Sequence, residues 1–90
     1  MTLDQLIAAA ESTLRSLLDD RAARTQALAD MRAAAESGDN APALADVDAA
    51  IAARDALDPQ IDDARQRVED LRAAAARDAA AADLARDIAP

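Results

Sequence analysis

The chain has 90 residues, enough for one small domain, with a formal net charge of −8 and no aromatic residue, histidine or cysteine. Eighteen acidic side chains against ten basic ones argue against nucleic acid and anionic membrane surfaces as partners. Charged residues also interrupt every apolar run before it reaches the length of a membrane span. We therefore expect neither a nucleic-acid partner nor a membrane partner.

The residue types needed for catalysis are scarce. Without histidine, cysteine or lysine, acid–base chemistry would rest on carboxylates alone, and nucleophiles on a few helical serines and threonines. The single glycine cannot form a phosphate-binding loop. Acidic pairs such as Asp19–Asp20 and Asp62–Asp63 lack the loop of a calcium site and are typical of a solvated helix face. We expect no enzyme activity, cofactor, metal or small-molecule substrate.

The spacing of apolar residues over 3–36 predicts one long amphipathic helix. Apolar residues recur at alternating spacings of four and three, as in the seam of a coiled coil. Thr2 is the predicted N-cap, and Gly38 is expected to end the helix in the left-handed conformation. A short turn then leads to a next N-cap at Asn40 or Ala41, so the following helix returns antiparallel.

Two consecutive seam positions of this helix are charged, Arg21 and Arg24. They could set the register or the choice of partner by pairing with carboxylates on a facing helix. Alternatively, their side chains extend off the seam into solvent. On a straight helix the apolar stripe can instead pass through Leu18, Ala22 and Thr25. In each case the middle of the helix is its weakest packing region.

Oppositely charged residues four positions apart add local support to the predicted helices. The pairs expected from this spacing are Glu11 with Arg15, Asp20 with Arg24, and Asp63 with Arg67.

A second helical segment begins near Pro42 and is interrupted at Asp58–Pro59, where proline removes a backbone donor. Asp58 can also serve as the N-cap of a fresh helix, so we expect a kink or a one-residue break near Pro59. The third segment resumes the four–three spacing from Ile61 to Ala75. Residues 73–90 are alanine-rich, and we expect them to fray or to form a helical connector.

These elements predict an all-α fold: an antiparallel helical hairpin or coiled coil over residues 1–72, with a connector or tail over 73–90. Much of the apolar content is alanine, which buries little area. We expect self-association or a partner to complete the core, and a weakly stable helical monomer is the alternative. The predicted helix-packing residues are Leu14, Leu17, Leu28, Met31, Val47, Ile51, Leu57, Ile61, Val68 and Leu71.

Residues 50–72 resemble a pattern found near the N-terminus of many tailed-phage major capsid proteins. The pattern is a Leu-Asp pair, then Ile, then Arg-Val, then Leu, represented here by Leu57-Asp58, Ile61, Arg67-Val68 and Leu71. The alanine-, arginine- and aspartate-rich helix over 3–37 is similar to the same region, the scaffolding or delta domain of capsid proteins with the Hong Kong phage fold. Pro59 departs from the family, which usually continues a helix there.

The resemblance covers nearly the whole chain, residues 1–88, and implies a role in assembly. Such domains cluster as helical bundles beneath each capsomer inside the procapsid, in the cytoplasm of the bacterial host, and a maturation protease removes them before DNA is packaged. The implied partners are other copies of the chain and capsid subunits. The resemblance leaves open whether the chain is an excised domain, a cleavage product or a separate scaffold protein.

Two other functions are compatible with the sequence. One is a free-standing coiled-coil adaptor or regulator, a class that includes secreted helical hairpins. It would use the same apolar seams. An acidic DNA mimic would need a continuous negative surface, against which the interspersed arginines argue.

Overall fold

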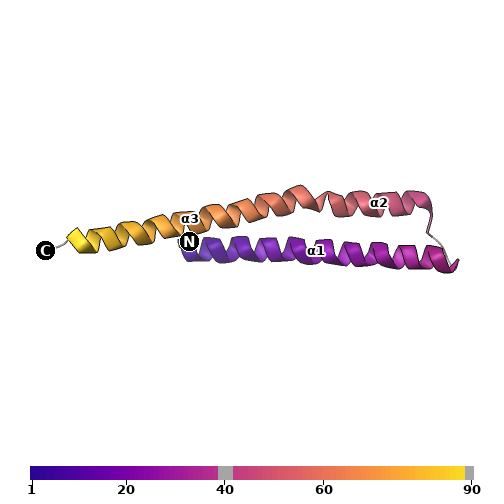
Figure 1. Cartoon of the computed structure of the whole chain (residues 1–90), viewed down its shortest axis with the longest axis horizontal. Coiled ribbons are helices and arrows are strands. Elements are labelled where there is room, and N and C mark those ends of the chain that lie inside the picture. The colour runs from indigo at the N-terminus through magenta and orange to yellow at the C-terminus, as the bar shows by residue number, and fades with distance from the viewer. Residues whose placement is uncertain (39–41, 89–90) are drawn as a thin grey trace.

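The structure, a computed structural model, describes residues 1–38 and 42–88. Three helices follow one another: α1 (Leu3–Ser37), α2 (Leu44–Asp55) and α3 (Leu57–Ile88). Helix α1 forms one arm of a hairpin, and α2 and α3 together form the other (Figure 1). The molecule is a rod of 78 × 20 × 16 Å, and its described residues contain no strand. The predicted all-α antiparallel hairpin is confirmed.

Both ends of α1 follow the sequence signals. The Thr2 hydroxyl accepts a hydrogen bond from the Gln5 backbone N–H at 3.2 Å, and the Gln5 side chain accepts one from the Thr2 N–H at 2.8 Å. This reciprocal capping box satisfies two N–H groups that have no acceptor within the helix. Gly38 closes the other end with a φ of 75°, a left-handed conformation that glycine adopts without a side-chain clash. The predicted N-cap and helix end are therefore confirmed.

The start of α2 differs from the prediction. Asn40 and Ala41, the N-caps expected from the sequence, lie outside the described residues, and the N-cap in the structure is Ala43. Its backbone is extended, and its carbonyl oxygen accepts a hydrogen bond from the Val47 N–H at 3.2 Å. No side chain caps this end, so α2 depends more on packing against α1 than on its own N-terminus.

The second arm is interrupted at Ala56, between α2 and α3. The sequence suggested that Asp58 could be the N-cap of a fresh helix, and this is wrong. Asp58 is the second residue of α3, and Pro59 is the third. Proline is tolerated there because the first N–H groups of a helix have no intrahelical acceptor. The Gln60 side chain donates to the Ala56 carbonyl oxygen at 3.3 Å beside the break. A bend of the helix axis at Pro59 itself stays a prediction.

The hairpin core is a thin strip. Its buried apolar side chains, within the part of the chain that the structure describes, are Leu28 from α1 and Leu57, Ile61 and Val68 from α3. Leu28 is the most enclosed of them, with 1% of its surface exposed. The seams on either side of this strip are covered only in part, so the two arms of one chain do not fill the space between them.

Replacing Leu28 with alanine tests the importance of this strip. We expect Leu28→Ala to lower the free energy of unfolding by about 2–3 kcal/mol, since it removes buried methyl groups and leaves a cavity. Leu44, which is 76% exposed, provides a matched control, and Leu44→Ala should change stability by no more than about 0.5 kcal/mol. Urea unfolding followed by circular dichroism at one fixed chain concentration measures both. Equal effects would contradict the assignment of the core.

Candidate interaction surface

The predicted packing residues fall into two groups in the structure. Four of them are the buried core residues, and the other six are half-buried. The half-buried group retains exposed apolar surface, which water or another helix must cover. Its members are Leu14, Leu17, Met31, Val47, Ile51 and Leu71.

The apolar seam of α1 continues through Arg21 rather than around it. Arg21 is half-buried, whereas Ala22 and Thr25 of the alternative stripe are exposed; Leu18, the third member of that stripe, is 37% exposed and lies beside Arg21 in a pocket between the arms. Hence a charged side chain occupies the middle of the interface, as the coiled-coil spacing indicated.

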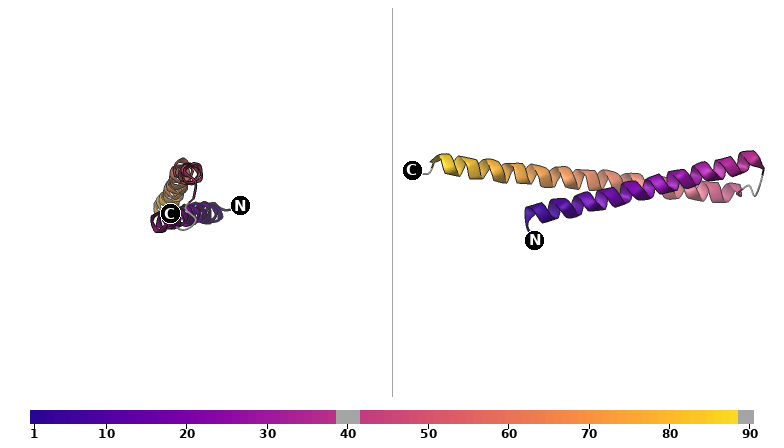
Figure 2. Two further views of the ribbon diagram at one scale, coloured as in Figure 1. Left: turned by 90° about the vertical axis from the view of Figure 1, so that its right-hand side faces the viewer. Right: turned by 90° about the horizontal axis from the view of Figure 1, so that it is seen from below.

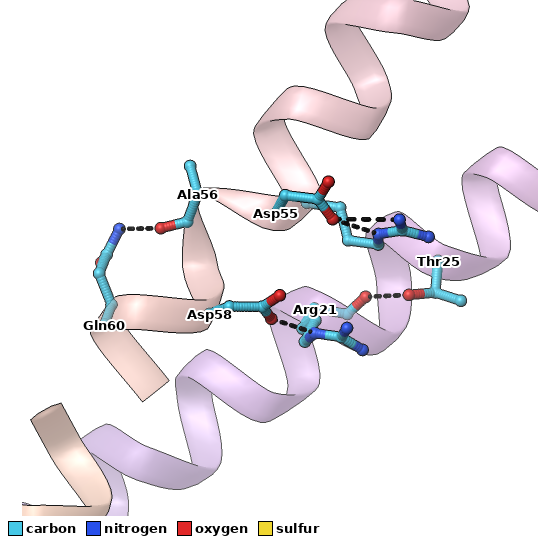
Figure 3. Close-up of polar contacts among 7 residues, drawn as sticks. Arg21, Thr25, Asp55, Ala56, Asp58 and Gln60 are labelled. Atoms are coloured by element: carbon cyan, nitrogen blue, oxygen red, sulfur yellow. Dashed lines mark hydrogen bonds and ion pairs between the residues drawn. The ribbon is translucent and has the colours of Figure 1, made fainter. Parts of the chain in front are cut away.

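A charged pair joins the arms at this point. The Arg21 Nε donates to the Asp58 Oδ1 at 2.7 Å, so the middle of α1 is tied to the first turn of α3 (Figure 3). This hydrogen bond, together with the charge of Asp58, raises the pKa of the Arg21 guanidinium above its ordinary value. Arg21 therefore stays charged at any pH at which the protein is handled. It pairs with a facing helix, the first of the two interpretations given for the seam arginines.

Arg24 behaves differently from Arg21. Its Nε lies 3.1 Å from the Asp20 Oδ1, one turn earlier on the same helix, and nearly half of each side chain is exposed. The predicted Asp20–Arg24 pair is thus confirmed. Because both charges are on α1, this pair supports the helix but carries no information about the facing arm.

A second cross-arm pair lies toward the open end of the hairpin. The Glu11 carboxylate accepts from Arg72 of α3, with Nη2 and Oε1 3.1 Å apart. Glu11 was expected to pair with Arg15 on its own helix, and that prediction is wrong, because Arg72 is brought within reach by the antiparallel packing. The two cross-arm pairs, one central and one distal, both match a single antiparallel register.

An apolar groove runs along one side of the interface. It has a volume of about 480 Å³ and lies between the N-terminal half of α1 and the first half of α3. Leu6, Ala9, Ala10 and Leu17 line it from α1, and Ala64 lines it from α3. Figure 2 shows that the arms cross at an angle and that the N-terminal end of α1 diverges from α3. The arms therefore leave this apolar surface uncovered.

The polar rim of the groove includes two opposite charges, Asp63 and Arg67, beside Gln60. The sequence predicts a pair between Asp63 and Arg67, but the structure contains no such pair. Neither side chain makes an ion pair or a hydrogen bond with the described residues. The four–three spacing of the central seam does not predict this groove; the signal for it is Leu6, an apolar residue on the N-terminal part of α1 that lines it.

The last part of α3 extends beyond the start of α1 and has no opposite arm (Figure 1). Residues 76–86 are all exposed, and Leu84 is 63% exposed. The helix nevertheless continues to Ile88, as the high alanine content favours. We call this segment, residues 76–86, the free arm.

The described ranges, 1–38 and 42–88, contain neither a cluster of three or more acidic side chains placed to hold a metal ion nor a helix long and apolar enough to cross a membrane. Comparison with protein-family models, with curated proteins and with solved structures found no match.

The Arg21–Asp58 contact can be tested by exchanging its charges. Arg21→Asp and Asp58→Arg should each lower the melting temperature, because each places like charges together in the interface. The double exchange should recover most of the loss, though not all of it, since arginine in the first turn of α3 opposes the helix dipole. The effects should shrink at high salt, where exposed charges are screened.

Arg86 serves as the control for this exchange. It pairs with Asp83 at 2.6 Å within the free arm, so Arg86→Asp should leave the melting temperature nearly unchanged. Circular dichroism gives the melting temperatures of the two single variants, the double exchange and the control. Additive losses in the double exchange would show that Arg21 and Asp58 do not act together.

Proposed function

We propose that this chain is an assembly scaffold that acts through helix–helix self-association. The observation that carries the proposal is the incomplete cover of its seams: four apolar side chains are buried in the described hairpin, while six further seam residues are half-exposed. Apolar surface arranged as a helical seam gains free energy when a further helix covers it. The thin rod shape supports side-by-side packing of several copies.

We further propose that the assembled structure is the procapsid of a tailed phage. This step is supported by the resemblance of residues 50–72 to the scaffolding domain of capsid proteins. The charge of the chain is compatible with it, since a lining with a net charge of −8 per copy would repel incoming DNA and would need to be removed before packaging. In this role the partners are other copies of the chain and the shell subunits, in the cytoplasm of an infected bacterium.

A free-standing adaptor or regulator is the second candidate, and the free arm is the observation that favours it. Leu84 and the alanines around it form an exposed helix surface outside the hairpin, available to a helix of a different protein. The neighbourhood of the gene distinguishes the two candidates. The gene of a scaffold is expected to lie next to the gene of a shell protein or to continue in frame into it. The gene of an adaptor is expected to do neither.

The scaffold role predicts that shell assembly depends on the hairpin. Co-expression of the chain, as encoded, with the shell protein of the same genome should yield closed particles of uniform size. Leu28→Asp, which places a charge in the core strip, should yield aberrant particles or none, whereas Leu44→Asp at an exposed position should assemble normally. Electron microscopy of purified particles measures the outcome.

Two results would contradict the scaffold role. One is uniform closed particles with the Leu28→Asp variant or without the chain. The other is a genome that encodes no shell protein next to this gene.

A further inference from the structure

The groove between α1 and α3 has the chemistry of a surface that binds its own copy. Its floor is apolar and contains small side chains at Ala9, Ala10 and Ala64. Small residues let a second helix approach to the short end of the usual 8–10 Å interaxial distance. Leucines at positions 6 and 17 flank this floor, and both are half-buried in the single hairpin. A helix lying in the groove would complete their burial.

The charge of the groove indicates what that helix carries. The chain as a whole has a net charge of −8, which opposes close contact between copies. The groove is different: the charged residues that line it are one aspartate, Asp63, and one arginine, Arg67. This surface is thus locally neutral, and both of its charges are without a partner among the described residues.

We propose that the groove binds a second copy of the chain about a two-fold axis near Ala64. In an antiparallel pair of α3 helices centred there, the flank of each α3 that carries Gln60, Asp63 and Arg67 lies over the groove of the other copy. Arg67 of each copy then comes beside Asp63 of the other, so the same ion pair forms twice. Such self-complementary contacts are the rule at two-fold interfaces.

This dimer deepens the proposed function and rests on it, since it names the surface through which copies associate. Two hairpins joined in this way form a four-helix bundle with the alanine floors at its centre. The free arms of the two copies, residues 76–86, would extend from opposite ends of the bundle because the two α3 helices run antiparallel. Each arm would remain available for further contacts in a larger assembly.

Charge reversal followed by mixing tests the proposal. Asp63→Arg alone places arginine against arginine twice across the axis, and Arg67→Asp alone places aspartate against aspartate twice. Each variant by itself should dimerise about tenfold or more weakly than the natural chain. Mixing the two variants should restore dimers, because every Arg67–Asp63 contact then joins opposite charges again. The double variant D63R/R67D should also dimerise by itself.

The matched control reverses two charges on the opposite flank of α3, Arg65 and Glu69, which are also four residues apart. Arg65→Asp and Glu69→Arg should dimerise like the natural chain, and mixing them should change nothing. Sedimentation equilibrium gives the dissociation constants, and circular dichroism at a fixed concentration shows that every variant remains helical.

The outcomes separate this inference from the function on which it rests. If the natural chain associates but the Asp63 and Arg67 variants associate equally well, the groove is not the interface, while self-association stands. If either single variant forms dimers by itself as tightly as the natural chain does, the two-fold contact is also wrong. If the natural chain stays monomeric at every concentration, both the groove contact and the scaffold proposal are wrong.

Discussion

The hairpin contains few large apolar side chains, and this scarcity limits how tightly its two arms can pack. Without any aromatic residue, and with alanine supplying much of its apolar content, the described hairpin buries one leucine of α1 and three apolar residues of α3. Alanine stabilises long helices by propensity, but it removes little surface from water when two helices pack. The helices are thus long and regular, while the contact between them is narrow.

Charged pairs also join the two arms of the hairpin. Arg21 interrupts the seam of α1 at its centre, where another coiled coil would have leucine, and its partner Asp58 lies beside the break between α2 and α3. A charge at a seam position lowers stability but favours one register over its alternatives. An apolar stripe rich in alanine distinguishes poorly between registers, and the pairs Arg21–Asp58 and Glu11–Arg72 join the arms in the observed alignment.

The sequence was sufficient to predict the fold, because the relevant signals are local. Thr2 and Gly38 define the ends of α1 through backbone chemistry, and the four–three spacing placed Leu28, Ile61 and Val68 in the core. The break moved to Ala56 because proline is acceptable in the first turn of a helix, a point that sequence spacing does not settle. The partner of Glu11 and the shape of the groove depend on how the arms cross, which local patterns do not specify, although Leu6 indicated a wider apolar face there.

We infer that one hairpin is too thinly packed to be the working form of this chain, and the dependence of its melting temperature on chain concentration tests this inference. Association stabilises the folded state by mass action, so the melting temperature followed by circular dichroism should rise steadily as the natural chain is concentrated. A sharp, cooperative transition at high temperature that does not move with concentration would show that a single hairpin is sufficient, and would contradict the account.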